Sequence, residues 1–347
     1  MVNKTIAVLA CANGLGHVRR VISIISFMLK NGFEGKIEAF IPINHLSYFE
    51  NWEDCNYFIN NDRVSIKDFT YPQKNKIKTN HLFGKEWEKI ELPDLSGYDI
   101  VWSDNILQVL EQRHDAIISG SFFWYEVFEK NMVGNGLENF VKSQKRLLYS
   151  IKPRMIGNEY FSTKEVKLNT EFYPVGLYRY STLYREKNNK GILLSCGLGG
   201  EEEALTKKAI KQIIDENIKP PDLLYVEPRL LPKRFPDWVK EADFSDEMFH
   251  YCAAVCIRPG MGTLSDSLIS RNRVFAFSKK NSYEMIHNSN VIERLLIGQK
   301  SKDAFHAYKD AIEYLKDQEQ VSQQIYRTSH LRMDGVFATA DIIANAN

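Results

Sequence analysis

A histidine directly after a glycine-rich turn is the first candidate for chemistry in the chain. The order is Gly14-Leu15-Gly16-His17, and apolar residues continue at helical spacing from His17 to Lys30. A helix N-terminus offers unpaired backbone N–H groups and a partial positive charge, which favour the neutral imidazole that a general base requires. We therefore predict that His17 acts as a general base. The alternative is a half-exposed histidine that caps the turn.

A second glycine turn follows a buried apolar run and leads to an acid. The run from Ala253 to Ile257 predicts a strand, and Gly260 and Gly262 open a helix with Thr263 in its first turn and Asp266 further along. Backbone amides at such a turn can hold a diphosphate, and a nearby carboxylate can accept hydrogen bonds from ribose hydroxyls. This pattern predicts a nucleotide site. The alternative is an ordinary helix start in which Asp266 is a surface acid.

Polar residues further along form a cluster that a sugar could use, namely Asn281, Tyr283, Glu284, His287 and Asn288. The alternative is a solvated loop before a helix predicted from Val291 to Leu296.

Three familiar cofactor motifs are missing from the sequence. The dinucleotide-binding fingerprint requires a third glycine, but Arg19 and Glu202 stand at that position after the two strand–glycine–helix turns. No glycine–lysine pair lies in the frame of a phosphate-binding P-loop. The five cysteines are scattered and lack a second Cys/His pair at zinc spacing, so buried thiols are expected. We expect no cofactor and no metal site.

Composition narrows the class of protein further. The chain has 347 residues, of which 44% are hydrophobic, and 45 Lys and Arg balance 44 Asp and Glu to a formal charge of +1. This balance argues against a broadly basic nucleic-acid coat, and the length favours two domains. No apolar run reaches the roughly 18 residues of a membrane span. We expect a cytoplasmic protein with no nucleic-acid partner.

The elements around these motifs alternate between strands and helices, which is typical of parallel sheets covered by helices. The pattern begins with a strand at Thr5 to Ala10 and restarts with a strand at Gly191 to Cys196, a glycine turn and a helix from about Glu201. Further strands are expected at 36–41, 98–103, 115–119, 154–157, 223–226, 253–257 and 273–277, and a loop at 173–176. We predict an α/β fold of two Rossmann-like domains that face one another across a cleft. Their bounds are 1–160 and 161–335, and a helix over 336–347 packs back on the first domain.

The order of these motifs resembles that of GT-B glycosyltransferases. The matching segments are Gly14-Leu15-Gly16-His17, Gly197-Leu198-Gly199-Gly200, Phe244-Ser245-Asp246-Glu247-Met248 and Arg258 to Leu268. The sequence is most similar to the UDP-N-acetylglucosamine transferases that make lipid II and to related UDP-glycosyltransferases. The resemblance implies transfer of a sugar from a nucleoside-diphosphate sugar, a UDP-sugar, to a hydroxyl acceptor. It also implies a role in the synthesis of cell-envelope glycans or glycoconjugates, with an acceptor that could be lipid-linked.

The resemblance also assigns roles to residues. His17 lies at the reacting centre, backbone groups near Ser245 read the base, and Asp266 holds the ribose. The nucleotide-sugar site comprises the residues that match the family's motifs, which are Gly14, Gly16, Gly199, Gly200, Ser245, Arg258, Gly260, Met261, Gly262, Thr263, Asp266, Glu284 and Asn288. No Asp-x-Asp pair occurs, so the metal-binding carboxylates of GT-A transferases are missing. Helix N-termini and basic residues would then stabilise the leaving group, which predicts a metal-independent reaction.

The sequence departs from the family in two places. Glu201, Glu202 and Glu203 follow the second glycine turn, where they would repel a diphosphate unless their side chains point outward. Tyr283-Glu284 replaces the usual glutamine-containing sugar motif, which leaves the donor sugar open.

A basic segment could bear on the acceptor. Lys142, Lys145, Arg146, Lys152 and Arg154 interleave with Leu147, Leu148 and Ile151, with no acid among them. This segment predicts a patch for an anionic membrane surface or a lipid-diphosphate acceptor, and the alternative is a solvated helix face.

Two other functions fit the same motifs. The first is a nucleotide-sugar hydrolase on the same fold, in which water replaces the acceptor. The second is a non-catalytic protein that binds a nucleotide sugar.

Overall fold

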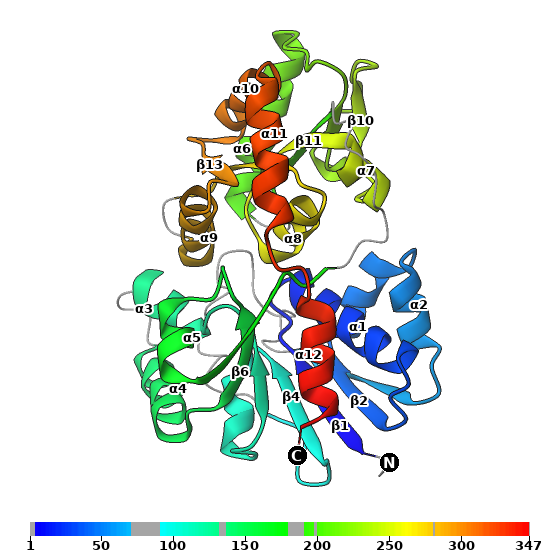
Figure 1. Ribbon diagram of the computed structural model, residues 1–347, viewed down its shortest axis with the longest axis vertical. Helices are drawn as coiled ribbons and strands as arrows, with labels where there is room; N and C mark the ends of the chain where they lie inside the picture. The colour runs from blue at the N-terminus through cyan, green and yellow to red at the C-terminus, as the bar shows by residue number, and fades with distance from the viewer. Residues whose placement is uncertain are drawn as a thin grey trace. The chain divides into compact units, whose positions relative to one another are not determined.

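The computed structural model describes residues 4–70, 91–131, 137–179, 191–197, 200–279 and 282–346. The chain divides into two compact domains (Figure 1). The first comprises Met1–Tyr178 and Asp334–Asn347, and the second comprises Arg179–Met333. The predicted boundary after residue 160 is therefore wrong, because the strand at Glu171–Val175 pairs with the sheet of the first domain.

The first domain is built on a parallel sheet in which the described residues form seven strands. Their order across the sheet is β3-β2-β1-β4-β5-β6-β7. The strands are β1 (Thr5–Ala10), β2 (Lys36–Ile41), β3 (Val64–Asp68), β4 (Ile100–Asp104), β5 (Ile117–Ser119), β6 (Arg154–Asn158) and β7 (Glu171–Val175). The helices are α1 (Leu15–Lys30), α2 (Glu53–Ile59), α3 (Trp124–Asn131), α4 (Glu138–Ile151), α5 (Lys164–Asn169) and α12 (Gly335–Ala344), and short 3₁₀ turns lie at Ile43–Phe49 and Leu107–Glu111.

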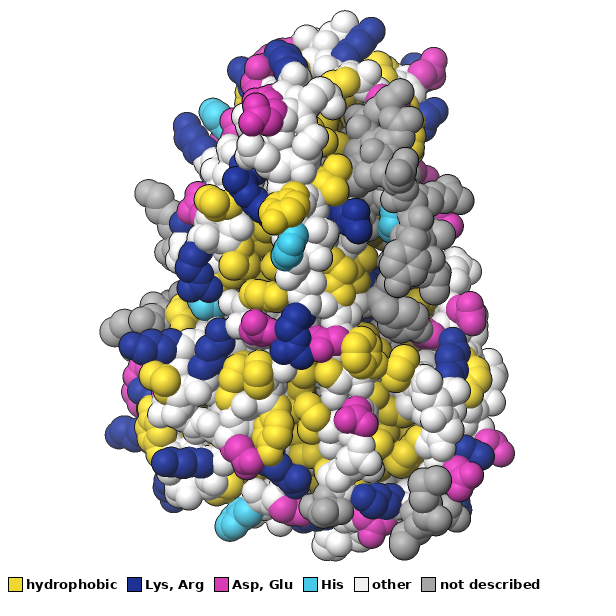
Figure 2. Space-filling model, viewed as in Figure 1, with side chains coloured by type: hydrophobic (Ala, Val, Ile, Leu, Met, Phe, Trp, Pro, Cys, Tyr) yellow, Lys and Arg dark blue, Asp and Glu magenta, His cyan; other side chains and the backbone are white. Residues whose placement is uncertain are grey.

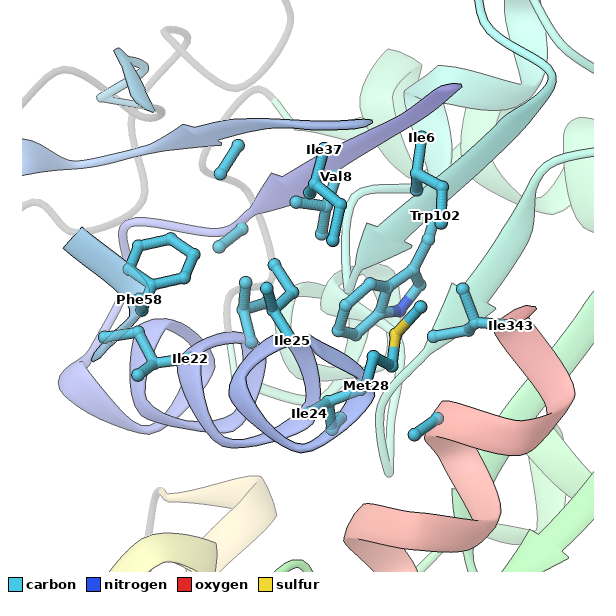
Figure 3. Close-up of a cluster of buried hydrophobic side chains, with 14 of the residues drawn as sticks. Ile6, Val8, Ile22, Ile24, Ile25, Met28, Ile37, Phe58, Trp102 and Ile343 are labelled. Atoms are coloured by element: carbon cyan, nitrogen blue, oxygen red, sulfur yellow. The ribbon is translucent and has the colours of Figure 1, made fainter. Parts of the chain in front are cut away.

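The main core of the first domain lies between one face of the sheet and the helices α1, α2 and α12 that cover it (Figures 1 and 3). Ile22 and Ile25 of α1 recur at helical spacing and are almost fully buried against the sheet. Trp102 of β4 is 1% exposed, and its indole N–H donates to the Ser119 hydroxyl at 2.8 Å. Ile343 of α12 belongs to the same cluster. The C-terminal helix is thus part of this core.

The second domain repeats the same topology. Its described residues form six parallel strands in the order β10-β9-β8-β11-β12-β13. The strands are β8 (Gly191–Ser195), β9 (Leu224–Val226), β10 (Val239–Glu241), β11 (Cys252–Ile257), β12 (Arg273–Ala276) and β13 (Gly298–Lys300). The helices are α6 (Gly200–Asp215), α7 (Asp246–Tyr251), α8 (Met261–Ile269), α9 (Tyr283–Arg294), α10 (Ala304–Leu315) and α11 (Gln318–Ser329), with a 3₁₀ turn at Pro228–Leu230.

These two sheets confirm the prediction of an α/β fold with two Rossmann-like domains. Four strands near the sheet edges, β3, β7, β10 and β13, were not expected from the sequence. The predicted loop at 173–176 is wrong, because Tyr173 and Val175 pair with Ile156 and Asn158 of β6. Proline in this segment is compatible with a strand at the edge of a sheet, where one side of the backbone needs no partner.

Candidate functional site

The carboxyl end of the first sheet brings His17 next to an acid. Strands β1 and β4 are neighbours, and the chain continues from them towards opposite edges of the sheet. Open α/β sheets bind ligands at such a switch point. The chain turns into α1 at Gly14, whose φ of 110° is readily available only to glycine. This turn places His17 Nδ1 3.1 Å from Oδ1 of Asp104, the last residue of β4.

Arg20 fixes this acid from the next turn of α1. Its Nε donates to Asp104 Oδ2 at 2.7 Å and its Nη2 donates to Oδ1 at 2.6 Å, in the two-pronged geometry of strong arginine–carboxylate pairs. The side chain of Asp104 is fully buried and that of Arg20 is 9% exposed. Burial by itself would raise the pKa of Asp104, but Arg20 and His17 outweigh it, so the pKa lies below its ordinary value. Asp104 is therefore a carboxylate at neutral pH.

The charge on Asp104 determines which nitrogen of His17 carries the proton. An ionised carboxylate can only accept hydrogen bonds, so the contact with Asp104 at 3.1 Å favours a proton on Nδ1. Arg20 Nη2 lies 3.3 Å from the same nitrogen, but it donates to Asp104 Oδ1 over the shorter distance of 2.6 Å. The other ring nitrogen, Nε2, then keeps its lone pair and can act as a base. His17 is 12% exposed and does not cap α1 with its side chain. The alternative of a half-exposed capping histidine does not describe this arrangement.

Sequence reasoning missed Asp104 as a site residue. The strand that it ends was predicted, but only as far as Ser103. An acid directly after the buried run Ile100-Val101-Trp102-Ser103, beside the first strand, was the signal that could have found it. An aromatic side chain lies beside this pair. The ring centroids of Trp124 and His17 are 6.4 Å apart, and Phe122 packs against Trp124 with a centroid distance of 5.1 Å.

The second sheet has its own switch point between β8 and β11. The backbone N–H of Arg258, directly after β11, donates to the Ser195 carbonyl of β8 at 3.3 Å. Gly260 is the N-cap of α8, and Met261, Gly262 and Thr263 form its first turn. The first N–H groups of an α-helix have no partner within it and can receive an anion. A Cβ at Gly260 or Gly262 would meet nothing within 4 Å, so the backbone there is open to close approach.

The loop after β8 already holds an anion from the chain itself. The Glu227 carboxylate accepts hydrogen bonds from the Cys196 and Gly197 N–H groups at 3.1 and 3.2 Å and from the Ser195 hydroxyl at 2.8 Å. Arg229 pairs with Glu227 and donates to the Gly197 carbonyl. A diphosphate therefore cannot use the amides of Cys196 and Gly197 while Glu227 occupies them. Gly200 is the first residue of α6, and Gly199 lies outside the described residues.

The acids after this turn are engaged elsewhere. Glu203 pairs with Lys207 at 2.7 Å and with Arg229 Nη1 at 2.6 Å. Glu202 Oε1 accepts from the Lys279 N–H at 3.4 Å. The side chain of Glu201 lies outside the described residues. For Glu202 and Glu203, the structure supplies the partners that the sequence left open.

Asp266 is a buried acid, so the alternative of a surface acid is wrong. Its side chain is 5% exposed, and its Oδ1 lies 3.2 Å from Nε of Arg179, the first residue of the second domain. Arg179 also pairs with Asp246 at the start of α7. A ribose ligand at Asp266 would thus meet a carboxylate that an arginine already holds in place.

Ser245 has partners for its own polar groups within the chain. It is the N-cap of α7, where its hydroxyl accepts from the Met248 N–H at 3.1 Å. The hydroxyl and N–H of Ser245 both donate to Asp243, and its carbonyl accepts from the Phe249 N–H. These contacts favour a structural role for Ser245 over direct reading of a base.

The predicted sugar cluster lies on a helix and not on a loop. Helix α9 begins at Tyr283, so the predicted helix start at Val291 and the alternative of a solvated loop before it are both wrong. Asn281 lies outside the described residues. Glu284, in the first turn, is partly exposed. Asn288 is 1% exposed and its amide donates to the Pro259 carbonyl at 2.8 Å. This hydrogen bond ties α9 to the loop before α8, so Asn288 shapes the proposed phosphate loop.

The basic segment belongs largely to α4, and the structure favours the alternative of a solvated helix face. Leu147 and Leu148 are 7% and 0% exposed, so they belong to the interior of the domain. Lys145 pairs with Glu129 at 2.6 Å, and Arg154 donates to the Asp115 carbonyl. On the face seen in Figure 2, basic and acidic side chains are interspersed.

Three further observations concern the described chain as a whole. All five cysteines are buried thiols, as expected. Among the described residues, no group of three or more His, Cys, Asp or Glu side chains is placed to hold a metal ion. Within the same part of the chain, no helix combines the length and the apolar character needed to cross a membrane.

Comparison with known proteins identifies the fold. No protein-family model and no curated protein matches the chain. Solved structures do match over nearly the whole length. The glycotransferase of kitacinnamycin is 11% identical, with a TM-score of 0.65 and 99% of each chain covered. The chain has the GT-B fold.

Two further solved structures carry nucleotides. TcCGT1 in complex with UDP is 9% identical, with a TM-score of 0.65, and the match covers 99% of this chain and 100% of the other. UGT89C1 of Arabidopsis thaliana, complexed with UDP-L-rhamnose, is also 9% identical, with a TM-score of 0.60 and 99% of each chain covered. At these identities the likeness concerns the fold.

Proposed function

We propose that the protein is a glycosyltransferase that moves a sugar from a UDP-sugar to a hydroxyl acceptor. The observation that carries this proposal is the His17–Asp104 pair at the switch point of the first sheet, in a chain with the fold of glycosyltransferases. Structures with this fold have been solved with UDP and with UDP-L-rhamnose. Glycine-rich turns at the second switch point provide amides suited to a diphosphate.

In this proposal, His17 removes the proton from the acceptor hydroxyl through Nε2. The acceptor oxygen attacks the anomeric carbon of the sugar, the bond from that carbon to the diphosphate oxygen breaks, and UDP leaves with the bonding electrons. Attack from the side opposite UDP inverts the anomeric centre. Asp104, itself held by Arg20, keeps the imidazole in the required tautomer and stabilises the imidazolium that forms.

The donor is proposed to bind the second domain. The N-terminus of α8, with Gly260, Gly262 and Thr263, receives the diphosphate, and Asp266 accepts from the ribose hydroxyls. Backbone dipoles and the positive charge of Arg258 stabilise the leaving UDP, so the reaction requires no metal. The donor sugar and the acceptor are left open.

The test is an assay of UDP release with a panel of UDP-sugars, each with and without hydroxyl acceptors, followed by mass analysis of the product. His17→Gln should lower turnover by about 10²–10⁴-fold, the scale of a lost general base, and leave UDP affinity nearly unchanged. His306→Gln is the matched control. The His306 side chain is 48% exposed, and among the described residues its one ion pair is with the nearby Asp303.

Each alternative has its own result in this assay. UDP-sugar consumption at the same rate without any acceptor would identify a hydrolase. Tight UDP binding without turnover under every condition would identify a binding protein. Near-normal turnover of His17→Gln would refute the role of His17.

A further inference from the structure

Arg179 stands between two acids of the second domain. Its guanidinium pairs with Asp246 at the start of α7 and lies, through Nε, 3.2 Å from Oδ1 of Asp266 on α8. The Arg179 side chain is 13% exposed, and those of Asp246 and Asp266 are 29% and 5% exposed. One cation therefore joins two helices that lie side by side at the carboxyl end of the second sheet.

The burial of Asp266 gives this contact its importance. A carboxylate removed from water is costly unless a charged or hydrogen-bonding partner compensates it. Arg179 supplies a positive charge at one oxygen of Asp266, which compensates the burial of the carboxylate and restricts its rotation. A carboxylate held in one orientation is suited to accept two hydrogen bonds from hydroxyl groups.

Only arginine has the geometry for this double contact. The Nε–H and one Nη2–H lie on one edge of a rigid plane, and the second Nη2–H lies on the next edge, so the guanidinium can face two carboxylates at once. A lysine ammonium would keep the positive charge but would act as a single point that cannot hold both acids in the same way.

We propose that Arg179 is a positioning residue for the donor site: it orients Asp266 for the ribose hydroxyls and anchors α7 beside it. The inference rests on the proposed function, because it takes Asp266 as the ribose ligand. Ribose recognition would then depend on a residue that does not itself contact the nucleotide.

The experiment measures the affinities of UDP and of 2′,3′-dideoxy-UDP by titration calorimetry. We expect the wild-type protein to prefer UDP by about ten- to a hundredfold, the scale of hydrogen bonds to a charged acceptor. Asp266→Asn should reduce this preference strongly. Arg179→Ala should do the same although Arg179 is not itself a proposed ribose ligand, and Arg179→Lys should retain an intermediate preference.

A control separates positioning from general stability. Arg113 also forms a partly buried ion pair, with Asp115 at 2.7 Å in the first domain, where it donates to two backbone carbonyls. Arg113→Ala should lower the melting temperature without changing the preference for UDP. Because Arg179→Lys keeps the charge between the two acids, it provides a folded variant even if Arg179→Ala does not fold.

The outcomes distinguish this inference from the proposed function. If Asp266→Asn loses the preference for UDP but both folded Arg179 variants keep it, the positioning role is refuted and the donor site stands. If Asp266→Asn keeps the wild-type preference, or the wild-type protein does not bind UDP, both proposals fail. Loss of preference in Arg113→Ala would attribute the effect to general destabilisation and would overturn the inference.

Discussion

Replacement of Asp104 by asparagine tests the central pair of the first domain. The substitution keeps the size of the side chain but removes its charge, and the Asp104 side chain is fully buried against Arg20, which is 9% exposed. Removing one partner of a buried ion pair costs about 3–5 kcal/mol in the free energy of unfolding. We expect the lower end of this range, because the asparagine oxygen can still accept one hydrogen bond from Arg20.

The same substitution should lower turnover through His17. The asparagine amide can donate to Nδ1, which moves the imidazole proton to Nε2 and removes the proposed base. Turnover should fall by about 10²–10⁴-fold, with UDP affinity unchanged. Urea unfolding gives the stability and UDP release gives the turnover. Asp54→Asn is the matched control, because Asp54 is also a poorly exposed acid paired with a residue of α1, Lys30 at 2.9 Å, and has no role in the proposed site.

The stability difference should depend on pH in a defined direction. The pKa of Asp104 is lowered in the folded protein from its ordinary value near 3.8, so its stabilising contribution is complete above that value. The contribution is lost as the pH falls through the lower pKa of the folded state. The difference between wild type and Asp104→Asn should therefore be largest near neutral pH and should shrink below about pH 4. Wild-type stability and turnover in Asp104→Asn at pH 7 would refute the reasoning.

Three further predictions concern the second domain and the reaction. Glu227→Ala should lower the free energy of unfolding by about 3–5 kcal/mol, because it leaves Arg229 and the Cys196 and Gly197 amides without their buried carboxylate, whereas Glu227→Gln should lose less; urea unfolding measures both. UDP should slow hydrogen exchange of the backbone amides in 258–268, and protection confined to the first domain would contradict the proposed donor site. Turnover should survive EDTA, and its loss with recovery on adding magnesium or manganese would contradict a metal-independent reaction.

The central strands of both sheets could be predicted from the sequence because strands buried on both faces consist of continuous apolar runs. β1 and β2 have the predicted bounds, and β8 and β11 differ by one residue at one end. The strands that were missed lie at or near sheet edges. β3 has mostly exposed side chains, and β10 and β13 have only three residues each, so none of them forms a long apolar run. These short edge strands form because they pair with a neighbouring strand, and the sequence does not identify that neighbour.

The parts of the site that could be predicted are those whose residues lie close together in the sequence. His17 and Gly260 to Thr263 stand out because a glycine turn and a helix start lie within a few residues of one another. Asp104 lies 87 residues from His17, so nothing in the local pattern joins them. The same holds for Arg179, whose two acids lie on helices far along the chain. Ser245 and Asn288 match family motifs, but their hydrogen bonds within the chain could be seen only in the structure.

The chain passes between its two domains twice, and the two passages are joined in the first domain. The Gly176 N–H donates to the Asp334 carboxylate at 2.7 Å, and the Gly335 N–H donates to the Leu177 carbonyl at 3.0 Å. A Cβ at Gly335 would lie 2.5 Å from the carbonyls of both Gly176 and Leu177, so the close approach requires glycine there.

This crossing has a consequence for synthesis on the ribosome. The second domain is one continuous stretch, so it can fold as soon as it has emerged. The first domain is begun before the second but finished after it, because Val336, Ala340 and Ile343 of α12 belong to its core and are made after the second domain. Until those residues emerge, the nascent chain exposes the apolar side of α1 that α12 will cover. A chain that stops before Gly335 therefore carries a complete second domain beside an unfinished first one, which makes its truncation products prone to aggregation and degradation.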